Sequence, residues 1–256
     1  MGERRAERSR EIAALRTAVD LGMNLIDTAE MYGEGGAEEV VGEAIQGRRA
    51  DVFLVSKVYP HNASRKGAIA ACERSLRRLN TEKLDVYLLH WRGNIPLSET
   101  FEAFEHLRST GKIDAYGVSN FDTDDMQEAW TLAAGRKIVT NQILYNLTRR
   151  APEYDLLPWC REHNISVMAY SPVEQGRLIR DPNLSGLASK RGITVAQLAL
   201  AWVLAQPGVH AIPKSSEVEH VKENRVALDI QLTPDELAAL DSAFPPPKSK
   251  KPLDIL

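Results

Sequence analysis

The chain has 256 residues, of which 43% are hydrophobic and 26% charged, and its formal net charge is -3. These values are typical of a globular protein with one large α/β domain, and they disfavour a protein that binds nucleic acid or an anionic membrane. No apolar run reaches the roughly 18 residues of a membrane span, and no hydrophobic stretch follows the basic N-terminus, so we expect a cytoplasmic protein. Cys72 and Cys160 lack the spacing of metal ligands, and no metal site is predicted. Small-molecule chemistry is the favoured class of function.

Short β-branched runs alternate with helical stretches of period 3.6, which predicts strand-helix units around a parallel sheet. The predicted strands are 24–28, 52–58, 84–90, 115–119, 138–144, 166–171 and 209–213. The predicted helices are 6–21, 37–46, 66–79, 98–109, 123–133, 153–163, 194–205, 217–226 and 234–243. Thr194 and Thr233 are clear N-cap signals, and the second is followed by a proline and two acids. The proline-rich tail after residue 244 should run extended across the surface.

The number of predicted strands bears on the fold class. A closed TIM-type (β/α)8 barrel has eight strands, whereas this chain predicts seven and opens directly in a helix. An open barrel would leave unpaired strand edges, which natural proteins avoid. We therefore predict a single domain over residues 1–256, a TIM-type barrel that lacks its N-terminal hairpin and first strand. Either the natural product starts further upstream, or another segment fills the gap.

Four chemically complementary side chains lie at or just past the carboxyl ends of three successive predicted strands: Asp27, Tyr32, Lys57 and His90. In a β/α barrel the carboxyl ends of all strands meet at the face that carries the active site. Each residue taken alone has a common structural explanation, such as an ion pair or rim packing. Four complementary types at successive strand ends nevertheless indicate one active site.

These residue types suit proton transfer to a carbonyl oxygen. A tyrosine hydroxyl is a weak acid with an ordinary pKa of about 10, and a nearby ammonium favours its phenolate. Lys57 would supply the ammonium, and Asp27 would supply the charge that a buried lysine needs. His90 would hydrogen-bond the carbonyl and orient it, while Tyr32 protonates the oxygen as a hydride reaches the carbon.

The motifs DTAEMYG, VSKV, YLLHW, GKIDAYGVSNF, VTNQILYN, MAYSPV and AIPKS, in this order, resemble those of the aldo-keto reductases. The likeness runs from about Met1 to the C-terminus and is nearest to bacterial methylglyoxal reductases and diketogluconate reductases. It implies an NADPH-dependent oxidoreductase that reduces small aldehydes and ketones, such as the ketoaldehyde methylglyoxal, to alcohols. It also implies that Tyr32 is the general acid, that His90 orients the carbonyl, and that Asp27 and Lys57 tune Tyr32.

The same resemblance implies a set of residues that bind NADPH. The nicotinamide carboxamide would be held by Ser119, Asn120 and Gln142, and the ring would stack on Tyr170, which Ser171 follows. At the adenosine end, Lys214 and Ser215 would lie near the 2′-phosphate, with Glu223 and Asn224 near the adenine. His220 stands where many relatives carry an arginine, which predicts a weaker contact there. From the residues alone, Ser119 and Asn120 also fit a polar turn that caps the next helix. No GxGxxG motif follows a strand, which disfavours Rossmann-type binding.

The substrate pocket is less determined by the sequence. Met31 and Trp91 flank the proposed acid and histidine and are candidate pocket residues. The short tail shows no sign of a large lid, which favours small carbonyl compounds. We also expect the enzyme to be a monomer. Two rivals remain: a regulatory or inactive protein that keeps the reductase fold and cofactor pocket, and a Schiff-base aldolase that uses Lys57.

The resemblance also indicates a segment of roughly 20 residues that relatives carry before this start, which includes the first barrel strand and part of the cofactor wall. Our hypothesis is that a start codon was placed too late. On that hypothesis, the chain as written should be unstable or weakly active.

Overall fold

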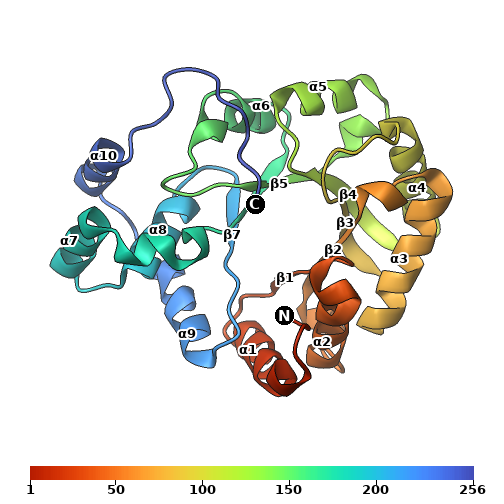
Figure 1. The fold of residues 1–256 in the computed structure, drawn as a ribbon, viewed down its shortest axis with the longest axis horizontal. Coiled ribbons are helices and arrows are strands. Elements are labelled where there is room, and N and C mark those ends of the chain that lie inside the picture. The colour runs from red at the N-terminus through yellow and green to blue at the C-terminus, as the bar shows by residue number, and fades with distance from the viewer. The chain divides into compact units, whose positions relative to one another are not determined.

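The structure is a computed structural model that describes residues 1–256 as alternating strands and helices (Figure 1). All seven predicted strands are confirmed, each with both ends within two residues of the prediction. The strands are β1 (Leu25–Asp27), β2 (Phe53–Val58), β3 (Leu84–Leu89), β4 (Ile113–Ser119), β5 (Thr140–Leu144), β6 (Ser166–Tyr170) and β7 (Val209–Ile212).

The nine predicted helices are also confirmed, with bounds within three residues of the prediction. They are α1 (Arg8–Asp20), α2 (Gly36–Ala44), α3 (Arg65–Leu79), α4 (Leu97–Ser109), α5 (Thr123–Thr131), α6 (Leu156–Glu162), α8 (Val195–Leu204), α9 (Val218–Val226) and α10 (Pro234–Ala243). None of the helices combines the length and the apolarity that crossing a bilayer requires.

A tenth helix, α7 (Pro182–Arg191), was missed by the sequence prediction. Its ends carry standard signals. The side chain of Asp181 accepts hydrogen bonds from two backbone N–H groups of the first turn, and proline occupies the first helical position. Gly192 ends the helix in a left-handed conformation with φ of 71°. Signals for both ends of this helix were therefore present in the sequence.

The chain divides into two compact units. The first unit comprises residues 1–140 with 215–221, and the second comprises residues 141–214 with 222–256.

In the first unit, β1 to β4 are parallel neighbours in chain order. Ile26 pairs with Leu54, and Lys57 pairs with Leu88. Five of the six residues of β2 are buried, which is typical of a parallel strand covered on both faces. Because the strands run in the same direction, their carboxyl ends share one edge, and the residues that follow them lie close together.

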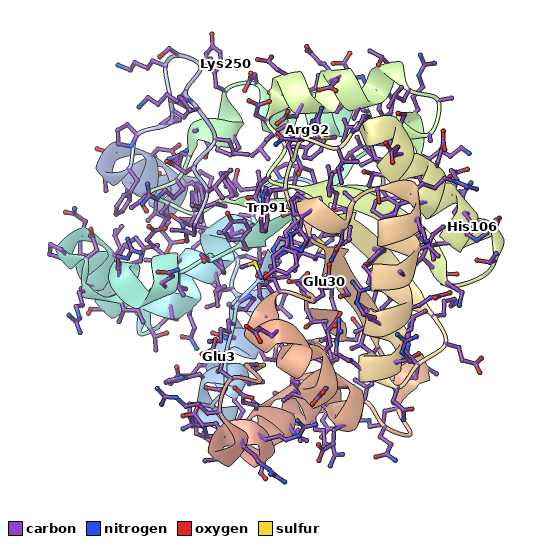
Figure 2. The ribbon with its side chains drawn as sticks, turned by 45° about the vertical axis from the view of Figure 1, so that its right-hand side comes forward. Glu3, Glu30, Trp91, Arg92, His106 and Lys250 are labelled. Carbon is purple, nitrogen blue, oxygen red and sulfur yellow. The ribbon has the colours of Figure 1, made fainter.

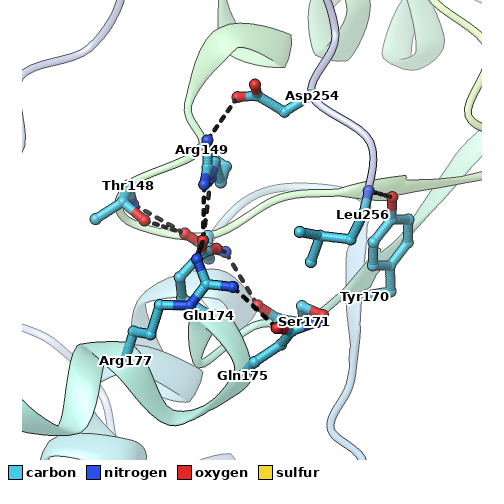
Figure 3. A network of polar contacts seen from close by, with 10 residues as sticks. Thr148, Arg149, Tyr170, Ser171, Glu174, Gln175, Arg177, Asp254 and Leu256 are labelled. Carbon is cyan, nitrogen blue, oxygen red and sulfur yellow. Dashed lines mark hydrogen bonds and ion pairs between the residues drawn. The ribbon is translucent and has the colours of Figure 1, made fainter.

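In the second unit, β6 and β7 are parallel, and the buried Trp202 of α8 packs 5.4 Å from the ring of Tyr145. After α10 the tail has no regular secondary structure, as predicted. Asp254 in the tail pairs with Arg149 at 3.5 Å, and the backbone N–H of Leu256 donates to the Tyr170 hydroxyl at 3.4 Å (Figure 3). The tail is therefore tied to the second unit by side-chain contacts.

Candidate active site

The four side chains predicted to form the active site come together at the carboxyl-end edge of the first unit. Asp27 is the last residue of β1, Lys57 lies near the end of β2, and His90 directly follows β3. Tyr32 begins the short 3-10 turn that follows β1. The convergence that the sequence predicted is confirmed by this geometry.

Lys57 is the centre of the cluster. Its Nζ donates to Asp27 Oδ2 at 2.7 Å, to the carbonyl oxygen of Thr28 at 2.9 Å and to the Tyr32 hydroxyl at 3.3 Å. An ammonium has three protons, so all of them are engaged. The Tyr32 oxygen accepts one of these protons, which leaves its own hydrogen to point elsewhere. The phenol is therefore arranged as a proton donor.

The charge on Lys57 survives complete burial of the side chain. Burial opposes the charge, but the nearby Asp27 carboxylate and the Tyr32 oxygen outweigh this effect and raise the pKa of Lys57 above its ordinary value. The group next to the phenol oxygen is thus an ammonium.

His90 is held in the neutral form beside this ammonium. Burial, together with the charge of Lys57, lowers the pKa of His90 to about 3. The rings of His90 and Tyr32 are 5.6 Å apart and nearly perpendicular. Nδ1 of His90 is buried without a hydrogen-bond partner, so Nε2 is the nitrogen left to meet a ligand. A neutral imidazole can donate one hydrogen bond to a carbonyl oxygen.

An aromatic wall, formed by Tyr59, His61 and Trp91, borders His90. The Tyr59 ring lies 5.7 Å from Trp91 and 4.7 Å from His61, and Trp91 lies 4.9 Å from His90. Sequence reasoning found Trp91 and the exposed Met31 but missed Tyr59 and His61. Tyr59 stands two residues after Lys57, so the strand period of two was a signal that pointed to it.

Three of the predicted cofactor residues belong to the first unit. Ser119 and Asn120 are buried at the end of β4, and Asn120 has a left-handed φ of 58°. The Asn120 amide donates to the backbone carbonyl of His90 at 3.1 Å and to the Ser119 hydroxyl at 3.2 Å. Ser215 exchanges hydrogen bonds with the backbone of Glu217 just before α9. The hydroxyl group of Ser119 and the amide group of Asn120 suit the donors and acceptors of a carboxamide.

The other predicted cofactor residues belong to the second unit. The Gln142 amide lies 4.0 Å from the sulfur of Met168, and the Tyr170 hydroxyl accepts from the N–H of Leu256. Ser171 has a left-handed φ of 50° directly after β6. The residues of this unit that were predicted for the adenosine end have exposed or partly exposed side chains: Lys214, Glu223 and Asn224. Exposure leaves these last side chains accessible to a ligand.

The sequence profile described as the aldo/keto reductase family matches residues 1–244. The chain belongs to this family. The aldo/keto reductase is 52% identical to methylglyoxal reductase YeaE of Escherichia coli over 100% of this chain and 92% of that protein. It is 34% identical to glyoxal reductase of Bacillus subtilis over 90% of this chain and 82% of that protein. The predicted resemblance is thereby confirmed.

A solved structure extends the comparison to the fold. The aldo-keto reductase of Klebsiella pneumoniae in complex with NADPH superposes with a TM-score of 0.98 at 56% identity. The match covers 100% of this chain and 92% of that one. The fold of this aldo/keto reductase is therefore the parallel α/β barrel of the family, as predicted, with seven strands in the chain.

Proposed function

We propose that this aldo/keto reductase reduces small aldehydes and ketones to alcohols with NADPH. The observation that carries the proposal is the contact of the Lys57 ammonium with the Tyr32 hydroxyl at 3.3 Å, because it prepares a weak acid to give up its proton. The names of the relatives support the substrate class, since two of them are a methylglyoxal reductase and a glyoxal reductase. Ketoaldehydes such as methylglyoxal are accordingly the first substrates to examine.

The residues of the cluster divide the work of the reduction. NADPH, when bound, supplies the hydride that adds to the carbonyl carbon. Tyr32 delivers its phenolic proton to the carbonyl oxygen, and Lys57, held by Asp27, stabilises the resulting phenolate. His90 is neutral, so it orients the carbonyl as a hydrogen-bond donor and does not itself add charge.

The cofactor assignment remains part of the proposal. Ser119, Asn120 and Gln142 would hold the carboxamide, Tyr170 with Ser171 would carry the nicotinamide ring, and Lys214 with Ser215 would meet the 2′-phosphate. Glu223 and Asn224 would contact the adenine. The relative from Klebsiella pneumoniae was solved with NADPH, which supports this choice of cofactor. We further infer that the protein works in the cytoplasm as a monomer.

Two other functions are less well supported. A Schiff-base aldolase needs a neutral amine, whereas the surroundings of Lys57 raise its pKa and keep it charged. A regulatory protein that binds the cofactor without turnover would not need the contact between an ammonium and a phenol. NADPH consumption with methylglyoxal separates the second alternative from the proposal, because the regulatory protein would bind NADPH but leave it unchanged.

The substitution Tyr32→Phe tests the proposed proton donor. It removes the hydroxyl and keeps the ring, so we expect the rate of methylglyoxal reduction to fall at least about 100-fold while NADPH affinity changes by less than about twofold. Steady-state NADPH consumption and a fluorescence titration of the cofactor measure the two quantities. Tyr154→Phe, at a tyrosine that is 49% exposed in the second unit, is the matched control and should leave the rate unchanged. A Tyr32→Phe variant as fast as the wild type would exclude the assigned role.

A further inference from the structure

A buried carboxylate near the active site has no part in the proton transfer described above. Glu30 lies between Asp27 and Tyr32 in the chain and is only 7% exposed. A carboxylate is costly to bury unless its oxygens are paired, so its partners indicate what it does. Glu30 and Trp91 are both labelled in Figure 2.

Two partners of Glu30 lie on the loop after β2. One oxygen, Oε1, accepts hydrogen bonds from the backbone N–H of Tyr59 at 2.8 Å and from the side-chain amide of Asn62 at 3.0 Å. The other, Oε2, pairs with Arg74 of α3 at 3.4 Å. The backbone N–H of Glu30 also donates to the carbonyl of Lys57, at 3.4 Å. Glu30 thus links the segment that carries Tyr32 to the loop that begins at Tyr59.

This loop carries two of the three rings of the aromatic wall. Tyr59 contacts Trp91 edge to face at 88° and lies 6.5 Å from the ring of His90. The next loop packs against the same segment, because a Cβ on Gly93 would come within 2.6 Å of the Pro60 side chain. The position of this loop therefore decides where two of the three rings of the wall lie relative to His90.

We propose that Glu30 is a positioning residue that determines which carbonyl substituents the site accepts, by holding the aromatic wall at a fixed distance from Tyr32 and His90. This inference rests on the proposed reductase function. Glu30 acts through the Tyr59 loop, because its side chain bonds to Tyr59, Asn62 and Arg74 and not to Tyr32 or His90. Its loss should consequently weaken substrate binding much more than the chemical step, and substrates large enough to reach the wall should be affected most.

Kinetics of Glu30→Ala and Glu30→Gln with methylglyoxal and the bulkier phenylglyoxal test the proposal. Glu30→Ala should raise KM for phenylglyoxal about tenfold, raise KM for methylglyoxal less, and leave kcat within about threefold. Glu30→Gln keeps an acceptor for Tyr59 and Asn62 and should restore both KM values. Glu105→Ala, which removes another hydrogen-bonded carboxylate of the first unit, is the matched control and should change neither KM. Equal increases in KM for both substrates, or a loss confined to kcat, would overturn the proposal.

A double-mutant cycle separates this positioning role from general destabilisation. Once Tyr59→Ala has removed the ring, adding Glu30→Ala should produce little further rise in KM, because the two residues act through the same contact. Additive effects would contradict the proposal.

Amide hydrogen exchange tests the link between Glu30 and the Tyr59 loop without requiring catalytic turnover. Peptides that contain Tyr59 should lose protection in Glu30→Ala and keep it in Glu30→Gln. Unchanged protection in Glu30→Ala would overturn the inference even if the protein were an active reductase. Lost protection in a protein that proved inactive would instead count against the proposed function alone.

Discussion

At the scale of single residues, the site depends on how Lys57 is kept charged inside the protein. A buried ammonium is stable only when its protons are accepted and its charge is compensated. The Asp27 carboxylate, the Thr28 carbonyl and the Tyr32 hydroxyl meet both requirements within 3.3 Å. The same ammonium donates a hydrogen bond to the Tyr32 hydroxyl and, together with burial, disfavours the protonated form of His90.

The neutral state of His90 predicts a pH dependence of stability. Its folded pKa of about 3 lies below the ordinary value of 6.5, so between these values the unfolded chain binds a proton that the folded chain excludes. The contribution of His90 is fully present above about pH 6.5 and is lost as the pH falls toward 3, at up to about 1.4 kcal/mol per pH unit. Urea unfolding of the wild type and His90→Gln at several pH values measures the difference in slope.

His106 is the matched control for this experiment, because it is an exposed histidine on α4 (Figure 2). His106→Gln should show the same dependence of unfolding free energy on pH as the wild type. If His90→Gln retained that slope too, the assigned protonation state of His90 would be wrong.

At the scale of the elements, helix boundaries follow local capping chemistry. Thr194 and Thr233 each form a capping box, in which the side chain accepts from the third helical N–H and the third side chain bonds back to the cap. Both threonines were identified from the sequence. The Asp181 cap of α7 is simpler, because its side chain accepts from two N–H groups of the first turn without a reciprocal bond, and the sequence prediction did not use this signal.

The capping box of α8 makes a quantitative prediction. Thr194→Ala leaves the Gln197 backbone N–H without its partner and should destabilise the protein by about 1 kcal/mol. Thermal or urea unfolding measures the loss. Thr131→Ala, at an exposed threonine whose hydroxyl bonds only within its own helix, should cost less than about 0.5 kcal/mol. Similar losses of unfolding free energy in the two variants would show that the Thr194 cap does not stabilise the protein more than an ordinary exposed hydroxyl.

At the scale of the whole molecule, the chain was predicted to be a single domain, and that remains a prediction. The family profile matches residues 1–244, a range that includes parts of both compact units. A single cooperative domain should unfold in one transition, with the same midpoint by far-UV circular dichroism and by tryptophan fluorescence. Both probes report on both units, since helices and strands occur in each, Trp91 and Trp130 lie in the first unit, and Trp159 and Trp202 lie in the second. Two separate midpoints would contradict the single-domain prediction.

Much of this protein was determined by the sequence alone. The alternation of apolar runs and amphipathic stretches predicted the seven strands and nine of the helices, because periodicity and capping are local properties. The position of Asp27, Tyr32, Lys57 and His90 at strand ends predicted their convergence, because parallel strands bring their carboxyl ends to one edge.

Other features were decided only by the tertiary structure. The neutral state of His90 and the charge of Lys57 depend on burial and on neighbours brought together from different strands. The link from Glu30 to the loop of Tyr59 joins residues 29 positions apart, and nothing in the local sequence marks it. Contacts between segments far apart in the chain depend on how the elements pack, whereas helix and strand formation depends mainly on neighbours in sequence.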